Sequence, residues 1–392
     1  RTAVGRRNGS LAGTHAVTLA AHAIDGMLNR ADINPALVDD VILGVVSSVG
    51  EQSCNVARQA VLASDLLPES VPGTTVDRQC GSSQQAIHFA AQAVMSGTQD
   101  VVIAGGVESM SRVPMFSNLG KGAFGWPNDA RIERAYPGSE RFFSQFVGAE
   151  LLAERWDIHR ADLDAYATRS HARAARALAA RAFEAEIVPI DVVDAESGGA
   201  TRSFAVDEGV RPGTTEEKLA ALEPISEGGM MTAGNASQIS DGAAALLVCN
   251  EAGLAKLKLN GTDVTPVATV RTLALGASDP VEVLGAPIPA TRTALEKAGL
   301  TIEDFARDGL VEINEAFSCV PLAWQRALGL EDDTAWLNAN GGAVALGHPL
   351  GATGAKLMTT LLHALVREDK RLGLLAICEG GGTANATIVE RC

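Results

Sequence analysis

Apolar residues form two short unbroken runs in the first part of the chain, VILGVV at 41–46 and VVIAGG at 101–106. Runs of this length, bounded by glycine, are typical of strands buried on both faces of a parallel sheet. Apolar residues at helical spacing occupy residues 16–30 and 80–97. The alternation of buried strands and helices predicts a layered α/β architecture.

The pattern changes between residues 115 and 235. The segment KGAFGWPND at 121–129 has the composition of a loop, whereas residues 148–184 show helical spacing and predict one amphipathic helix. After Met230 the α/β pattern resumes. We therefore expect an inserted subdomain built from helix and loop.

The two ends of the chain share a weak internal similarity. CGSSQQAIHFAAQAV at 80–94 leads to a buried run, and GHPLGATGAKLMTTLLHAL at 347–365 leads to LLAICEGGG at 374–382. Two copies of one unit would bring two helix N-termini to a shared crevice. A chance similarity of glycine-rich segments is the alternative.

Size and charge restrict the function classes. The chain has 392 residues, 46% of them hydrophobic. This is more than one hydrophobic core ordinarily contains, so we expect two or three packed units. A net charge of -15 argues against nucleic-acid binding, which relies on clustered cations. No run approaches the ~18 apolar residues of a membrane span, and the first ten residues lack a signal-peptide core. The chain begins without methionine, so a leading strand could be missing.

Cysteine usage indicates a reducing compartment. The chain has no CxxC pair and no Cys/His cluster at metal spacing, which predicts no metal site and a cytoplasmic location. The six cysteines are Cys54, Cys80, Cys249, Cys319, Cys378 and Cys392.

Cys80 and His348 are candidates for nucleophilic chemistry. The helix that follows Cys80 carries no charge and should be interior, so a thiolate at its N-terminus would be stabilised by free amides and the helix dipole. His348 lies among glycines, and a histidine near a cysteine generates thiolate. The alternatives are a buried structural cysteine and a solvated loop histidine.

A second cysteine ends an apolar run. Cys378 is followed by Glu379 and three glycines, and a strand end of this kind offers N–H groups that could form an oxyanion hole. Glu379 would raise the thiol pKa if it pointed inward and do nothing if it pointed outward. Asn314 and Glu315 follow another apolar stretch, which alone is a weak signal.

These blocks together resemble the thiolase superfamily, whose members cleave or form 3-ketoacyl-CoA. CGSS at Cys80, NEAF at 314–317, GHPLGATGA at His348 and CEGGG at Cys378 occur in the family's order and approximate spacing. The resemblance also covers RTAVGRRNGSLAG, GGVESMSRVP and TAGNASQISDGAAALLV, and so nearly the whole chain. The motif QCGSSQQA resembles the corresponding motif of degradative actinobacterial thiolases more than that of the acetoacetyl-CoA type.

The resemblance implies a duplicated five-layer αβαβα thiolase fold with an inserted loop domain. Residues 1–114, completed by about 236–265, would form the N-terminal half, and residues 266–392 the C-terminal half. Residues 115–235 would form the loop domain that covers CoA. Family members are dimers or tetramers, so we expect a homodimer or homotetramer.

The resemblance also assigns roles. Cys80 would attack the C3 carbonyl of a 3-ketoacyl-CoA with His348 activating the thiol, and Cys378 would protonate the acetyl-CoA enolate. His348 and a water on Asn314 would form one oxyanion hole, and the N–H groups of Cys80 and Gly380 the other.

Coenzyme A would be a co-substrate, with no permanently bound cofactor. By position, Arg211 would lie near the adenine, and Ser237 and Phe317 would flank the pantetheine; a solvated loop charge is the alternative for Arg211. The other implied CoA contacts are Leu222, Ala233 and Ala316.

One departure bears on the substrate. Many short-chain biosynthetic thiolases have Met-Gly where this chain has Gln145 and Phe146, and that methionine lines the acyl pocket. The departure favours a degradative role, in fatty acid β-oxidation or steroid degradation, on medium, long or bulky acyl chains. The products would be acetyl-CoA or propionyl-CoA and a shortened acyl-CoA, reversibly by Claisen condensation. Phe146 could equally be a packing residue.

Three alternatives stay open. One is an acetoacetyl-CoA-specific acetyl-CoA acetyltransferase. Another is a ketosynthase, but those sites lack the second catalytic cysteine, so Cys378 favours a thiolase. The third, from another class, is a non-catalytic acyl-CoA or lipid-binding relative.

Overall fold

The computed structural model describes residues 1–139, 141–194, 200–259, 261 and 264–392. Helices and strands alternate over most of this length. The strands are β1 (Gly5–Arg6), β2 (Asp40–Gly44), β3 (Gly73–Val76), β4 (Val101–Ser109), β5 (Ile190–Asp194), β6 (Ala200–Phe204), β7 (Ser240–Cys249), β8 (Ala268–Ala277), β9 (Gly309–Ile313), β10 (Leu372–Glu379) and β11 (Thr383–Arg391). The α-helices are α1 (Ala16–Arg30), α2 (Val56–Ala63), α3 (Ser82–Met95), α4 (Ala130–Ala135), α5 (Gln145–Arg155), α6 (Arg160–Ala179), α7 (Glu216–Ala220), α8 (Glu251–Leu259), α9 (Pro287–Ala298), α10 (Ile302–Asp308), α11 (Cys319–Ala327), α12 (Ala343–Leu346) and α13 (Thr353–Arg367).

Two mixed sheets form the framework. The first has the order β1-β7-β4-β2-β3 and the second the order β8-β11-β10-β9. In the first sheet β2 pairs in parallel with β3 and β4, and in the second β9 pairs in parallel with β10. Every residue of β4 and β10 is buried, as expected for strands covered on both faces.

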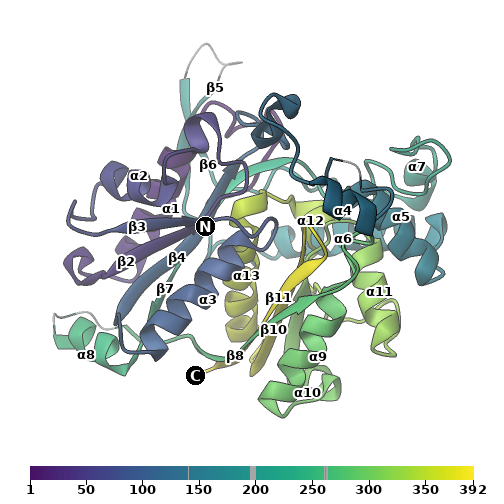
Figure 1. The fold of residues 1–392 in the computed structure, drawn as a ribbon. Helices are drawn as coiled ribbons and strands as arrows, with labels where there is room; N and C mark the ends of the chain where they lie inside the picture. The colour runs from purple at the N-terminus through teal and green to yellow at the C-terminus, as the bar shows by residue number, and fades with distance from the viewer. Residues whose placement is uncertain (140, 195–199, 260, 262–263) are drawn as a thin grey trace.

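The sheets and helices stack in five layers. Helices α1 and α2 cover the outer face of the first sheet, and α9 and α10 cover the outer face of the second. Helices α3 and α13 lie side by side between the two sheets (Figure 1). The predicted α/β five-layer architecture is confirmed.

The central helices can approach closely because α13 has a glycine where it meets α3. A side chain at Gly354 of α13 would overlap the backbone of Gln84 in α3. The first turns of both helices are buried, and that of α13 contains the buried Lys356. This packing brings the segments before the two helices, which contain Cys80 and His348, to the middle of the molecule.

The inserted segment between β4 and β7 contains α4 to α7 and the strand pair β5–β6. The prediction of one helix over 148–184 is wrong: α5 and α6 are separate helices. The chain breaks because Asp157 adopts a left-handed conformation with φ 52°. Asp162 then caps a new helix start by accepting from the backbone N–H of His159 at 2.9 Å.

The insertion packs against both halves of the molecule. Helix α5 and the start of α6 join the core around the second sheet through Leu152 and Leu163. The end of α6 and the chain after it join the core around the first sheet through Ala174 and Phe183. The segment thereby spans the two halves next to the central helices.

Candidate active site

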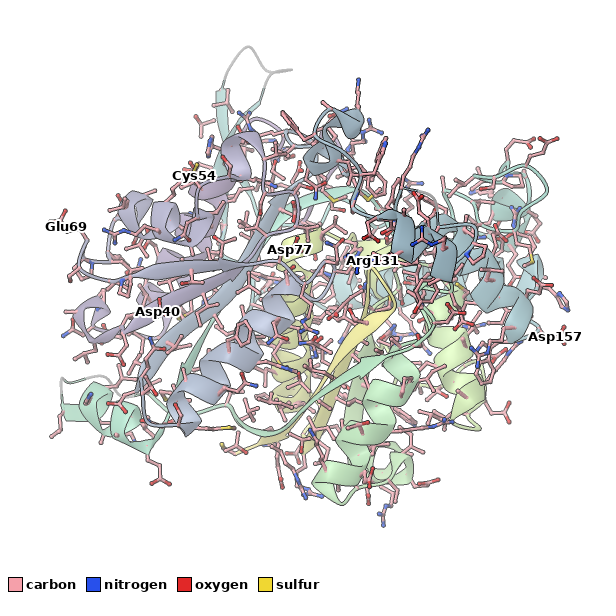
Figure 2. All side chains as sticks on the ribbon, in the orientation of Figure 1. Asp40, Cys54, Glu69, Asp77, Arg131 and Asp157 are labelled. Carbon is pink, nitrogen blue, oxygen red and sulfur yellow. The ribbon has the colours of Figure 1, made fainter. Side chains whose placement is uncertain are left out.

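Cys80 lies in a tight turn between β3 and α3. Gln79 before it has the left-handed φ of 48°, and Ser82 closes the turn by accepting from Arg78 N at 2.9 Å and donating to Gln79 O at 2.6 Å. No side chain caps the helix at Gly81. Asp77, at the start of this turn, is labelled near the centre of the view in Figure 2.

His348 is buried and held in one orientation. Its Nδ1 lies 2.6 Å from Thr353 Oγ1, and that hydroxyl donates its only hydrogen to Pro349 O at 2.9 Å. The hydroxyl oxygen therefore accepts from Nδ1–H, and Nε2 keeps its lone pair. Burial lowers the pKa of His348 to about 3, so the ring is neutral at physiological pH and able to act as a base.

Asn314 directly follows β9 and faces the histidine. Its Nδ2 lies 3.5 Å from His348 Nε2, and its backbone N donates to Ala376 O at 3.1 Å. Within the described part of the chain, the buried Oδ1 atom of Asn314 has no hydrogen-bond partner. An orphaned buried acceptor of this kind suits a bound water or a substrate group.

Cys378 lies in β10 next to the turn of Cys80. Its side chain is fully buried, and the neighbouring Gly380 approaches the turn so closely that a Cβ there would be 3.0 Å from Gln79 Cγ. Gly381 and Gly382 have φ values of 77° and 75°, which let the chain reverse into β11. The backbone of Gly380 therefore lies beside the turn that holds Cys80.

Both thiols are neutral at rest. Burial, then the nearby Glu379, raises the pKa of Cys80 to about 12. Burial, then proximity to Cys80, raises the pKa of Cys378 well above its usual value. Since the imidazole is also uncharged, formation of a thiolate requires proton transfer from the thiol to a base.

Glu315, for which the sequence contains only a weak signal, anchors this region. Its two oxygens accept four hydrogen bonds, which link α6 with the segment that leads to His348. Because Glu315 is adjacent to Asn314, the network fixes Asn314 relative to the histidine. The donors are Tyr166 Oη at 3.0 Å, Ser170 Oγ at 2.8 Å, Asn338 Nδ2 at 3.1 Å and Val344 N at 3.0 Å.

A second buried carboxylate was missed by the sequence reasoning. Glu108 near the end of β4 accepts four hydrogen bonds that join the loop after β2 to the turn after His348. The signal in the sequence was a carboxylate at the end of an apolar strand. The donors are Val46 N at 2.9 Å, Ser47 N at 3.0 Å, Gln52 Nε2 at 2.7 Å and Gly351 N at 2.9 Å.

Two cavities meet at the site. The cysteine cavity, of about 310 Å³, is lined by Cys80 and Gly380. The histidine cavity, of about 520 Å³, is lined by His348. Their shared walls are Met115, Gln145 and Leu350. The site is therefore open on two sides of one junction.

The histidine cavity gathers most of the predicted CoA contacts. Its lining includes Arg211, Ala233, Ser237, Ala316 and Phe317. Leu222 does not line it: its side chain is 38% exposed and lies against Gly234.

Gln145 and Phe146 are the first two residues of α5. Gln145 lines both cavities, and its Nε2 lies 3.6 Å from Met115 Sδ. Phe146 lines the histidine cavity and packs edge-on against Phe317, with ring centroids 5.7 Å apart. Phe146 thus both packs and faces the histidine cavity.

Two further properties concern cofactors and membranes. Within the described ranges, no group of three or more His, Cys, Asp and Glu side chains could hold a metal ion. In the same part of the chain, no helix has the length and apolar character needed to cross a membrane. All six cysteines are free.

Comparisons with known proteins cover nearly all of the chain. Residues 1–252 match the family described as "Thiolase, N-terminal domain", and residues 264–391 match "Thiolase, C-terminal domain". A solved acetyl-CoA acetyltransferase from Bacillus anthracis is similar in structure, with a TM-score of 0.86 and 33% identity over 100% of this chain and 96% of that one.

Curated relatives are similar over full length. The steroid 3-ketoacyl-CoA thiolase FadA6 of Mycobacterium tuberculosis is 50% identical over 394 residues, which cover 100% of this chain and 92% of the relative. The 3-ketoacyl-CoA thiolase FadA of Escherichia coli (strain K12) is 41% identical, over 100% of this chain and 97% of the relative. The 3-ketoacyl-CoA thiolase of Bacillus subtilis is 40% identical, with the same coverage of both chains.

Proposed function

This chain belongs to the thiolase family, and on that premise we propose that it is a degradative thiolase that cleaves 3-ketoacyl-CoA with free CoA. The observation that carries the proposal is the junction of the two cavities. The cysteine cavity contains the nucleophile candidate, and the histidine cavity contains the base and most of the predicted CoA contacts. A substrate lying across the junction would present its thioester to one side and its acyl group to the other.

The first half-reaction begins with proton transfer. His348 Nε2 takes the proton of Cys80, and the sulfur attacks the C3 carbonyl of the substrate. The backbone N–H groups of Cys80 and Gly380 would stabilise the tetrahedral oxyanion. The C2–C3 bond then breaks, which leaves an acyl group on Cys80 and the enolate of acetyl-CoA, or of propionyl-CoA from a branched substrate.

The enolate needs its own hole and a proton. The imidazole now carries hydrogen on both nitrogens, so Nε2–H can donate to the enolate oxygen together with a water held by Asn314. Cys378 gives its proton to C2 and becomes a thiolate. Its raised pKa is compatible with this role because an enolate carbon is a strong base.

The second half-reaction restores the enzyme. The thiolate of Cys378 takes the proton of incoming CoA, and the CoA sulfur attacks the acyl group on Cys80. The Cys80 thiolate leaves and regains the proton from His348. The reverse sequence is a Claisen condensation.

The cysteine cavity supports a substrate larger than acetoacetyl-CoA. Among the described residues that line it, none is charged, and three are phenylalanines. Its volume of about 310 Å³ lies near the lower end of the ~300–1,000 Å³ of small-molecule sites and exceeds what an acetyl group needs. The phenylalanines are Phe116, Phe142 and Phe143.

We propose a medium, long or bulky acyl chain, which includes a steroid-derived one. The relative at 50% identity is a steroid 3-ketoacyl-CoA thiolase, whereas the structural neighbour at 33% identity is an acetyl-CoA acetyltransferase. Specificity for acetoacetyl-CoA is the second candidate, favoured by that neighbour's name alone.

The remaining expectations stay part of this proposal. Coenzyme A is the co-substrate, and the cations of the histidine cavity, Arg6, Arg7 and Arg211, would attract its phosphates. For the two halves and the loop domain we propose the boundaries predicted from the sequence. We propose a cytoplasmic homodimer or homotetramer.

Steady-state thiolysis with free CoA tests the proposal. One enzyme preparation is compared on acetoacetyl-CoA, a long-chain and a steroid-side-chain 3-ketoacyl-CoA. The highest kcat/KM on a longer or bulkier substrate supports the degradative assignment, and the highest value on acetoacetyl-CoA supports an acetyl-CoA acetyltransferase. No thiolysis of any of them would contradict the proposal and favour a non-catalytic relative.

A further inference from the structure

Glu379 at the end of β10 turns its side chain into the protein. The side chain is fully buried, and its Oε2 accepts from Thr383 Oγ1 at 2.7 Å. Its Oε1 is buried without a hydrogen-bond partner among the residues described. Buried carboxylates normally pair both oxygens, as Glu108 and Glu315 do in this protein, so the orphaned oxygen needs an explanation.

The orphaned oxygen faces the nucleophile turn. A side chain at Gly81 would overlap Oε1, which places this atom on the backbone directly after Cys80. On its other side Glu379 is adjacent to Cys378 in the chain. The thiols of Cys80 and Cys378 and the carboxyl group of Glu379 therefore share one buried region. These three acidic groups come from two segments that are distant in the chain.

Little positive charge offsets these three groups. Arg78 Nη1 lies 3.9 Å from Oε2, and the arginine side chain is 32% exposed to water. His348 is neutral at rest. Two negative charges in such a region would repel each other strongly.

We propose that Glu379 controls thiolate formation at Cys80 and Cys378: it holds a proton on Oε1 while a neighbouring thiolate exists and releases it when both thiols are neutral. The roles of the two cysteines rest on the proposed function. The geometry of the three groups and the unpaired oxygen do not depend on it. Glu379 is thus a charge-regulating neighbour rather than a group that touches substrate.

The surroundings of Glu379 allow its carboxyl group to gain and lose a proton near physiological pH. Burial raises the pKa of Glu379 to about 7, opposed by the Thr383 hydrogen bond and by Arg78. The ionised carboxylate in turn raises the pKa of Cys80, as Glu108 and Asp77 do more weakly. Below pH 7 the carboxyl is neutral and Cys80 ionises more easily; above pH 7 the carboxylate suppresses the thiolate.

The test is the pH profile of alkylation of Cys80 by iodoacetamide, followed by mass spectrometry of the Cys80 peptide. For the wild-type protein the log rate should rise with pH, flatten near pH 7 and rise again. Glu379→Gln should match it at pH 5.5 and react ~10-fold faster at pH 8.5, because a like charge shifts a pKa by about one unit or more. Superimposed profiles would overturn the proposal.

A second variant should shift the pH at which the alkylation profile flattens, without removing the carboxyl group. Thr383→Val removes a hydrogen bond that lowers the pKa of Glu379, so the flattening should move to higher pH. If Glu379→Gln does not fold, this variant decides, and an unmoved profile overturns the proposal. Glu303→Gln on the exposed surface of α10 is the matched control and should behave as wild type.

The outcomes separate the two proposals. Alkylation needs only Cys80 and solvent, so its pH profile can be read even if thiolysis is absent. Absence of thiolysis by the wild-type protein would refute the proposed function alone. Normal thiolysis with superimposed alkylation profiles would refute only the role of Glu379.

Discussion

The two cavities differ in charge although they share three walls. The histidine cavity contains Arg6, Arg7 and Arg211, whereas the described lining of the cysteine cavity contains phenylalanines and carboxamides and no charged side chain. One end of a CoA thioester always carries phosphates, and the acyl end varies. Under the proposed function, the histidine cavity would recognise the CoA part that all substrates share, and the cysteine cavity would select among acyl groups.

Because of this contrast, substitutions at three kinds of residue should have different effects on the kinetics. A change in one of the catalytic residues should slow every substrate by the same factor. A change among the other residues of the histidine cavity should alter the KM for CoA whatever the acyl group. A change among the other residues of the cysteine cavity should reorder acyl substrates and leave the KM for CoA alone.

The largest effect is expected at the nucleophile. Cys80→Ala should lower thiolysis of every substrate by roughly 10⁴-fold or more, since the acyl-enzyme cannot form. Intact-protein mass spectrometry should show no acyl adduct. Cys378→Ala is the matched variant: it should still acylate Cys80 but not complete thiolysis. An adduct on Cys319, or normal thiolysis by Cys378→Ala, would contradict the assigned roles.

The next effect is expected at Asn314. Asn314→Ala should lower kcat by about 10²–10³, the usual cost of one oxyanion-hole donor, and leave the KM for CoA unchanged. Short and long acyl chains should slow by the same factor, which kinetics on two substrates would measure. A decrease confined to long chains would instead place Asn314 in acyl recognition and break the comparison.

The sequence was informative where the chemistry is local. Cys80 and His348 each precede a central helix and lie beside glycines, so a short window contained the signal. The break between α5 and α6 was missed because one left-handed residue, Asp157, interrupts an otherwise continuous helical pattern.

Other features of the site could not be predicted because they depend on contacts between residues far apart in the chain. The partners of Glu108 include Gly351, which is 243 positions away along the chain. Nothing in the sequence near either residue indicates that they meet. The sequence also could not show whether the Glu379 side chain points inward. Every residue of β10 is buried, so the strand has no alternation of polar and apolar residues from which the direction of a side chain could be inferred.

A smaller effect is expected on the CoA side. Arg211→Ala should raise the KM for CoA by about 10-fold, because the variant cannot make one charge-assisted hydrogen bond to a phosphate, and should do so for all acyl substrates alike. Arg131→Ala is the control, since this exposed residue of α4 does not line the histidine cavity. A reordering of acyl substrates by Arg211→Ala would count against the division of the site.

The smallest effect is expected on the acyl side, where the comparison is sharpest. Phe143→Ala should lower kcat/KM for a long or bulky 3-ketoacyl-CoA by about 5-fold relative to acetoacetyl-CoA, because the variant removes one apolar wall. Phe143 also packs edge-on against Tyr136 at 5.8 Å between ring centroids, so loop order could change as well. Tyr136→Ala removes that packing and keeps the wall, and it should leave the substrate order unchanged. Equal reordering by both variants would assign selectivity to the ordering of the loop rather than to the cavity wall.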